Sequence, residues 1–166
     1  MGAAHCLKEG TLKKIALAVL MSAVVPLMAA EPDGVVVWSG AELKGYGKKL
    51  APKMNAGKVA TERLATFPNH FAMIAHREGD GQAELHEKQA DLFVVASGEA
   101  TLVNGGEVVS PKTTEPNEVR GPSIKGGEKK ALAPGDVVHI PAKVPHQLLI
   151  PAGKEFTYFV VKVDTP

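Results

Sequence analysis

Residues 134–146 read PGDVVHIPAKVPH, a short apolar run between two turn-forming segments. Pro134 and Gly135 predict a turn, the apolar run from Val137 to Ile140 predicts a strand, and a proline-rich turn then presents His146. A short strand between two turns is typical of an antiparallel all-β domain.

The same pattern of short apolar runs separated by turn residues continues along the chain from Val59 onward. The stretches predicted as strands are Leu64 to Phe67, Phe71 to His76, Leu92 to Ala96, Thr101 to Val103, Val137 to Ile140, Gln147 to Ile150 and Phe156 to Val163. Asn104-Gly105-Gly106 predicts a hairpin turn between two of them. The polar stretch from Ser110 to Gly127 predicts a long loop or a loose hairpin inserted between strands. We therefore expect an antiparallel sandwich or barrel over residues 59–166.

Residues 31–58 are predicted to form an N-terminal extension with a short strand and a helix. Val35 to Trp38 is a short apolar run, and Ser39 and Glu42 have the spacing of a capping box. The helix is expected through Leu43 to Lys49, and Pro52 would end it.

Residues 1–30 have the pattern of a cleaved signal peptide. Lys13 and Lys14 precede an apolar run from Ile15 to Ala30 that ends in small residues. The alternative is a membrane anchor, but the run is shorter than the roughly 18 to 20 residues that span a bilayer. We expect an exported protein, periplasmic or secreted, with no membrane attachment after cleavage.

The composition argues against nucleic-acid binding and against thiol catalysis. The chain has 166 residues, enough for one domain, with 19 basic against 18 acidic side chains and 5% aromatic residues. No basic patch for nucleic acid is present, so no nucleic-acid partner is expected. Cys6 is the single cysteine and would leave with the signal peptide, which excludes thiol catalysis in the mature chain.

Histidines and carboxylates suggest a metal site. Glu84 and His86 point to one face of an extended strand, Asp91 follows shortly, and His146 comes from the stretch quoted first. Two imidazoles with one or two carboxylates would suit a divalent ion with open coordination positions. The alternative is a metal-free interior in which these groups bond to each other. Burying two carboxylates without a cation would cost several kcal/mol, which favours the metal.

The first of these segments resembles the first motif of the cupin superfamily, which runs from a glycine through His-x-His and Glu to a second glycine. This chain offers Gly79, Glu84-x-His86, Asp91 and Gly98 at nearly the same spacing. Glu84 stands in place of the first His, and Asp91 in place of Glu.

The second segment resembles the second cupin motif, Gly, Pro-x-Gly, His and Asn. The matching positions are Gly135, Pro141-x-Lys143, His146 and Ile150, with Ile150 in place of the Asn. The two motifs at this separation make the resemblance specific.

The resemblance implies a jelly-roll β-barrel with a metal inside it, bound by Glu84, His86, Asp91 and His146. Asp91 is shorter than the usual Glu, so it would either reach the ion or orient an imidazole. Carboxylate ligands favour Mn, Fe or Zn, and the choice among them stays open. Glu84 is the candidate catalytic residue, as a ligand that could also act as a base.

Two functions follow from the resemblance. The first is a metal-dependent enzyme acting on a small molecule, of dioxygenase, isomerase or lyase type. The alternative is a non-catalytic exported module that binds a small ligand or the metal itself. A homodimer is possible through exchange of Val35 to Trp38.

Other polar and aromatic residues are open candidates for the pocket. His76 and His139 either line it or lie outside it. The residues predicted as its walls are Phe93, Val95, Leu148, Phe156, Tyr158 and Phe159.

Overall fold

The computed structural model describes Met1 and residues 34–166, and the predicted signal peptide, apart from Met1, lies outside the described residues. Val37–Pro166 forms a compact unit that contains every helix and strand described. In chain order its elements are α1 (Gly40–Leu50), η1 (Ala51–Lys53), β1 (Val59–Thr66), β2 (His70–Arg77), β3 (Ala83–His86), β4 (Gln89–Gly98), β5 (Ala100–Asn104), β6 (Glu107–Val108), β7 (Lys112–Glu115), β8 (Glu118–Gly121), β9 (Ile124–Lys125), β10 (Glu128–Leu132), β11 (Val137–Ile140), β12 (His146–Leu149) and β13 (Phe156–Asp164).

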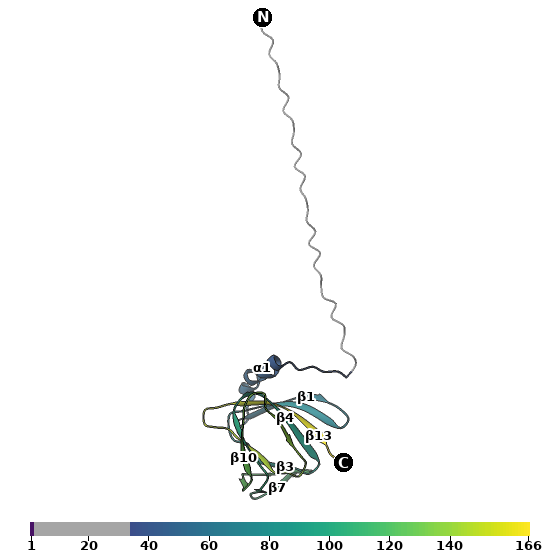
Figure 1. The fold of residues 1–166 in the computed structure, drawn as a ribbon, viewed down its shortest axis with the longest axis vertical. Helices are drawn as coiled ribbons and strands as arrows, with labels where there is room; N and C mark the ends of the chain where they lie inside the picture. Colours follow the sequence, from purple (N-terminus) through teal and green to yellow (C-terminus); the bar gives the residue numbers. More distant parts are fainter. Residues whose placement is uncertain (2–33) are drawn as a thin grey trace. The chain divides into compact units, whose positions relative to one another are not determined.

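The strands form two large antiparallel sheets (Figure 1). One has five strands in the order β1-β2-β13-β4-β11, which we call the first sheet. The other, the second sheet, has six strands in the order β10-β5-β12-β3-β8-β7. A small additional sheet pairs β6 with β9. Neighbours that are distant in sequence, such as β2 and β13, are typical of a jelly roll.

The main core lies between the two large sheets. Phe93, Val95 and Tyr158 come from the first sheet, whereas Leu102 and Leu148 come from the second, and all five are at most 5% exposed. Side chains alternate along each strand, so every second residue enters this interior. The predicted walls Phe93, Val95, Leu148, Phe156 and Tyr158 all belong to it.

A second core lies on the outer face of the first sheet, under α1 (Figure 1). Leu50 packs there with Ala60 and Ile74, and Phe159 contacts the same cluster. The prediction that Phe159 lines the pocket is therefore wrong, because its neighbours in β13 take the inward positions.

The predicted helix is confirmed as α1. The Ser39 side chain accepts a hydrogen bond from the Glu42 backbone N–H at 3.1 Å, and the helix ends where Pro52 follows within η1. The described residues contain no helix with the length and apolarity needed to cross a membrane.

Replacing Ser39 with alanine is expected to lower the free energy of unfolding by about 1 kcal/mol, because the first turn of α1 loses its cap. Chemical denaturation measures this change. Ser39→Asp should retain most of the stability, since aspartate also caps helices. An alanine variant as stable as the wild type would show that the cap contributes nothing here.

All seven predicted strands are present, with ends shifted by a few residues. The apolar runs do not predict β3 and β10, because their sequences, AELH and EKKAL, lack a long apolar stretch. β3 nevertheless has the extended geometry expected for Glu84 and His86.

Three local predictions need correction. Asn104-Gly105-Gly106 is not a hairpin turn, because β5 pairs with β10 and β12 whereas β6 pairs with β9. The stretch from Ser110 to Gly127 is not an open loop: it contains the hairpin β7–β8, and β8 pairs with β3 within the second sheet. Val35 to Trp38 forms no strand in the structure.

Gly98 is required by the close approach of two strands. Its φ is +79°, and a Cβ there would lie 1.9 Å from the Glu155 carbonyl oxygen. Only glycine fits this position, which explains the glycine that closes the first motif.

Candidate metal centre

The register of the second sheet places five polar side chains side by side. Glu84 of β3 lies opposite His146 of β12 and opposite Arg120 of β8. His86 lies opposite Glu118 of β8. Cross-strand neighbours have Cβ atoms close enough for direct contact, so the pairing itself assembles the group.

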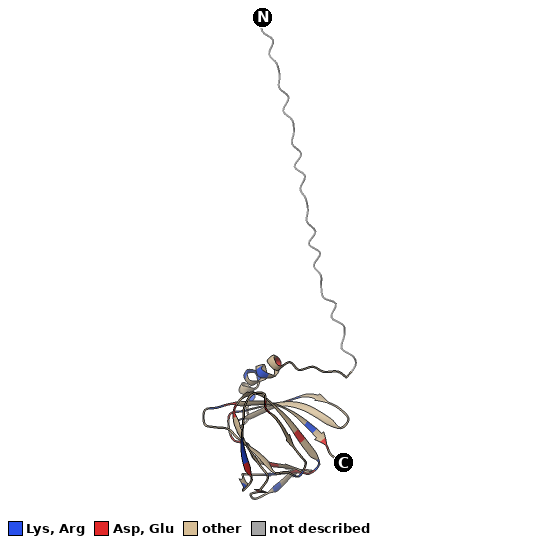
Figure 2. Ribbon diagram, in the orientation of Figure 1, with Lys and Arg blue, Asp and Glu red and all other residues tan. Residues whose placement is uncertain are grey.

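The first sheet contributes two charged residues from the facing side. Asp91 of β4 lies opposite Lys162 of β13, on the inward face that also carries Phe93 and Tyr158. In Figure 2 the basic segment of β13 lies beside the acidic segment of β4. Segments more than fifty residues apart thus converge between the sheets.

Three potential ligands meet within a small volume. Ligand atoms of Glu84, His86 and His146 all lie within 4.8 Å of one another. Glu84 Oε2 is 3.6 Å from His86 Nε2 and 3.9 Å from His146 Nε2. Asp91 is not part of this three-residue group, but its Oδ2 atom lies 3.3 Å from His86 Nε2 and 3.6 Å from His146 Nε2.

Both imidazoles are oriented by their other ring nitrogen. His86 Nδ1 bonds to Glu118 Oε1 at 2.6 Å, and His146 Nδ1 to the Val144 carbonyl oxygen at 3.1 Å. Because these oxygens accept, each Nδ1 carries hydrogen, and the Nε2 atom of each ring is the one turned toward the group. Such fixed tautomers are usual for metal-bound histidine.

Glu118→Leu is expected to weaken divalent-metal binding by about 10- to 100-fold, because His86 loses the carboxylate that orients its ring. Competition with a chelator of known affinity measures the change. Glu118→Gln keeps an acceptor oxygen and should have a smaller effect. Equal affinities for the leucine variant and the wild type would contradict this role.

Lys162 places a positive charge within the same group. Its Nζ atom lies 2.7 and 2.9 Å from the two Asp91 carboxylate oxygens and 2.7 Å from His86 Nε2. The ammonium therefore compensates Asp91, which is 2% exposed. The sequence argument assigns such a charge to a metal alone, and the structure shows that a lysine supplies part of it.

Glu84 is held as a carboxylate by arginines. Arg120 donates to Glu84 Oε1 at 2.6 Å, and Arg77 Nη2 lies 3.7 Å from the same oxygen. Burial acts to raise the pKa of Glu84, but the positive charge of Arg120 and its neighbours outweighs it and leaves the pKa below its usual value. An ionised carboxylate is a competent ligand, although a lowered pKa makes it a weaker base.

The histidines differ in charge. Burial acts to lower the pKa of His86, but hydrogen bonds with the Asp91 and Glu118 carboxylates raise it to about 9. Burial lowers the pKa of His146 despite the carboxylates nearby, and its ring is neutral.

The donor set fits a divalent ion. The buried Nε2 atom of His146 has no hydrogen-bond partner, an unusual state for a buried nitrogen. Two imidazole nitrogens and a carboxylate oxygen suit Zn, Fe or Mn. An ion on His86 Nε2 would require the Lys162 ammonium to leave that nitrogen, because two cations cannot share the contact.

The remaining histidine candidates lie elsewhere. His139 is exposed on β11. His76 is fully buried, but it faces α1 on the outer side of the first sheet, where its Nδ1 atom bonds to Thr157. Neither residue lines the interior.

The sequence analysis did not predict that Lys162, Arg120 and Glu118 belong to this group. Lys162 carried a readable signal, because it continues the inward series of Phe156, Tyr158 and Val160 within an apolar strand. Arg120 and Glu118 carried none, since the stretch containing them has no apolar run and its pairing with β3 is a tertiary feature.

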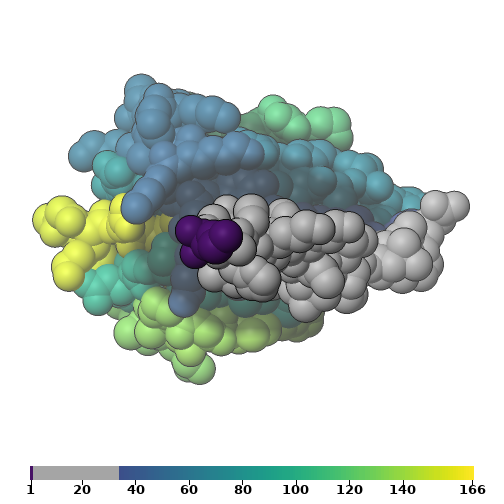
Figure 3. Space-filling view, turned by 90° about the horizontal axis from the view of Figure 1, so that it is seen from above, coloured from purple at the N-terminus to yellow at the C-terminus, as the bar shows by residue number. Residues whose placement is uncertain are grey.

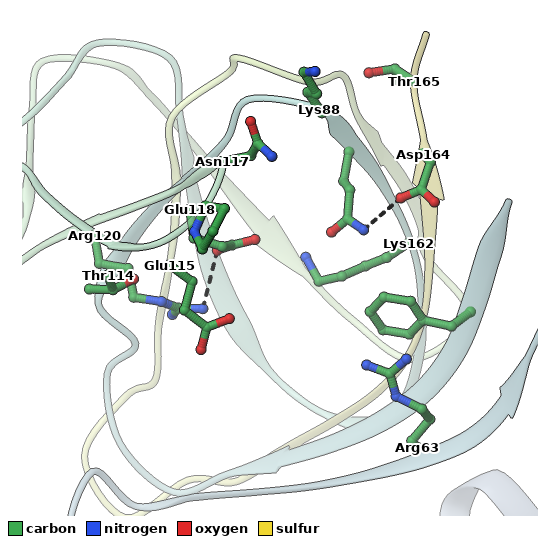
Figure 4. Close-up of a pocket in the computed structure, with 13 residues that line it drawn as sticks. Arg63, Lys88, Thr114, Glu115, Asn117, Glu118, Arg120, Lys162, Asp164 and Thr165 are labelled. Carbon is green, nitrogen blue, oxygen red and sulfur yellow. Dashed lines mark hydrogen bonds and ion pairs between the residues drawn. The ribbon is translucent and has the colours of Figure 1, made fainter.

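A cavity of about 500 Å³ adjoins the group (Figure 4). Lys162, Glu118 and Arg120 line it, together with Arg63 and Asp164. Figure 4 shows the Lys162 side chain extending into this space from β13. The C-terminal residues that follow β13, yellow in Figure 3, lie at the surface of the molecule. A small molecule in the cavity would contact Lys162 directly.

The sequence matches no family model and no curated protein. Solved structures do match. The TT1209 protein of Thermus thermophilus is 20% identical with a TM-score of 0.51, over 72% of this chain and 94% of that one. An uncharacterized conserved protein with a double-stranded β-helix domain from Klebsiella pneumoniae is 16% identical with a TM-score of 0.52, over 76% of this chain and 88% of that one.

The strand order and these matches define a double-stranded β-helix protein. This is the fold of the cupin superfamily, so the resemblance drawn from the two motifs is confirmed for the fold. At these identities the likeness concerns the fold, and the function has to be argued from the site.

Proposed function

We propose that this protein is a metal-dependent enzyme of the cupin type that acts on a small molecule. The single observation that carries the proposal is the convergence of Glu84, His86 and His146, whose ligand atoms lie within 4.8 Å of one another. The ion is Zn, Fe or Mn in this proposal. When bound, it would polarise an oxygen of the substrate as a Lewis acid.

The protein's own residues have distinct roles in this proposal. His86 and His146 bind the ion through Nε2, and Glu84 binds it as a carboxylate held by Arg120. Asp91 stays paired with Lys162 and holds that side chain beside the centre. Its distances to both imidazoles, 3.3 and 3.6 Å, leave it close enough to act as a further ligand once Lys162 moves.

Lys162 is the residue best placed to handle a proton or a negative charge on the substrate. Like Glu118 and Arg120, it lines the adjoining cavity, and its Nζ atom lies 2.7 Å from His86 Nε2 and 2.7 Å from Asp91 Oδ1. Glu84 is the sequence candidate for proton transfer, but its lowered pKa suits a ligand better than a base. We therefore propose Glu84 as a ligand and Lys162 as the group that contacts the reacting atoms.

A second candidate function is a non-catalytic exported module that binds a small ligand. The observation that favours it is the Lys162–Asp91 pair, which neutralises a buried carboxylate without any metal. This alternative keeps the cavity as the ligand site and makes the histidines part of a hydrogen-bonded interior.

Elemental analysis of the purified protein separates the two candidates. A stoichiometric divalent ion that is lost in Glu84→Ala, His86→Ala and His146→Ala supports the enzyme. Protein that binds no divalent ion after incubation with zinc, iron or manganese supports the metal-free module and overturns the first proposal.

Localisation and partners complete the proposal. We propose export through a signal peptide at residues 1–30, with no membrane attachment or nucleic-acid partner afterwards. The partner is a small molecule. Self-association as a homodimer is tested by light scattering, with a doubled mass as the supporting result and a monomer mass as the opposing one.

A further inference from the structure

His76 is a buried histidine that the proposed centre does not use. It lies in β2 between Ala75 and Arg77, whose side chains face the interior, and its own side chain faces outward under α1. A Cβ at Gly47 of α1 would lie 3.1 Å from Thr157 Oγ1 and 3.6 Å from His76 Nδ1. The helix backbone therefore packs directly onto the His76–Thr157 pair.

This packing fixes the ring. Thr157 lies opposite His76 in the β13–β2 register, and Thr157 Oγ1 bonds to His76 Nδ1 at 2.9 Å. Both residues are 0% exposed. With the hydrogen on Nδ1, donated to Thr157, the lone pair of Nε2 is free. His76 Nε2 is buried and has no hydrogen-bond partner.

Two carboxylates lie in front of that nitrogen. Glu78 Oε1 is 3.5 Å from His76 Nε2, and ligand atoms of His76, Glu78 and Glu155 all lie within 4.8 Å of one another. Glu78 directly follows β2 and Glu155 directly precedes β13, so paired strand ends bring them together. Both glutamates are exposed, which gives an ion access from solvent.

No other described cation compensates these carboxylates. Within the part of the chain that the structure describes, Glu78 has no ion-pair partner besides His76, and Glu155 has none. The neighbouring Lys154 is paired with Glu99 at 3.0 Å. The cluster therefore combines two carboxylates with a buried imidazole nitrogen that has no hydrogen-bond partner.

We propose that His76, Glu78 and Glu155 form a second divalent-metal site on the outer face of the first sheet. One imidazole nitrogen and two carboxylate oxygens, completed by water, suit a zinc-class ion. The bond from Nδ1 to Thr157 holds the ring for coordination, as hydrogen-bonded partners do in metal sites generally. An ion here would link the end of β2 to the start of β13.

Zinc titration of the metal-free full-length protein tests the site. We expect the double variant Glu78→Gln/Glu155→Gln to bind one equivalent of Zn²⁺ fewer than the wild type, or to bind that equivalent at least about 10-fold more weakly. Both positions are exposed, so the fold should be retained, which circular dichroism checks. The matched control Glu107→Gln/Glu128→Gln, also exposed and remote, should bind zinc as the wild type does.

The His86→Ala variant distinguishes this site from the proposed catalytic centre. If both sites exist, His86→Ala and the glutamine double variant each lose one equivalent, and not the same one, so combining them removes both. If only the outer site exists, His86→Ala changes nothing and the double variant loses the ion. A double variant that retains every equivalent bound by the wild type overturns the outer site, whatever the result for His86.

Discussion

His86→Ala and His146→Ala are each expected to abolish stoichiometric binding at the interior metal centre, with an affinity loss of more than about 100-fold. Each variant removes one of the two nitrogens that converge with Glu84 within 4.8 Å. A centre with a single nitrogen and a carboxylate cannot hold a zinc-class ion tightly against water. Chelator competition after loading with Zn²⁺ measures the loss.

The chain offers a matched control for this experiment. His139→Ala removes an exposed histidine from the neighbouring strand β11 and should leave interior binding unchanged. A second ion is proposed at His76. The number of Zn²⁺ ions bound per chain at the interior centre is therefore measured in protein that also carries Glu78→Gln/Glu155→Gln. A stoichiometric ion retained there by the His86→Ala/His146→Ala double variant would place the metal elsewhere and remove the basis of the proposed function.

Lys162→Met is expected to destabilise the metal-free protein by about 3 to 5 kcal/mol, because it leaves the Asp91 carboxylate buried without its ammonium partner. Asp91 is 2% exposed and receives both of its short contacts from Lys162 Nζ. The same substitution should raise affinity for Zn²⁺, since the ion no longer competes with a lysine at His86 Nε2. Urea denaturation and chelator competition measure the two effects.

Two further variants make this prediction specific. Adding Asp91→Asn to Lys162→Met should recover much of the lost stability, because the unpaired charge is gone. Lys154→Met, at an exposed pair with Glu99, should change the free energy of unfolding far less. If Lys162→Met were no more harmful than Lys154→Met, the ammonium would not be compensating Asp91.

Lys162 is expected to stabilise the metal-free protein and to weaken zinc binding, and both effects follow from the position of its ammonium beside Asp91 and His86. A lysine at a cation position stabilises the empty centre and weakens the filled one, so Zn²⁺ should raise the thermal midpoint of Lys162→Met more than that of the wild type. This difference also separates the two proposed functions, because a metal-free module would show no zinc-dependent shift at the interior centre.

Local chemistry in the sequence determined much of the architecture. The serine at position 39 caps α1 as its spacing with Glu42 predicted, since a cap needs only residues within one turn. Apolar runs located seven strands, and the two motifs predicted the fold. The motifs also named Glu84, His86 and His146, whose potential ligand atoms lie within 4.8 Å of one another in the structure. These signals are readable because strand periodicity and capping depend on neighbours along the chain.

Only the tertiary structure decided the register and the charge balance. β8 carries Arg120 and Glu118, and their positions opposite Glu84 and His86 depend on the pairing of β3 with β8. The position of Lys162 opposite Asp91 likewise depends on the pairing of β13 with β4. The sequence did not decide whether His76 lines the interior, and in the structure its side chain faces outward under α1. Which side chains face one another across strands depends on contacts between distant segments, and no local pattern encodes the ammonium that Asp91 meets.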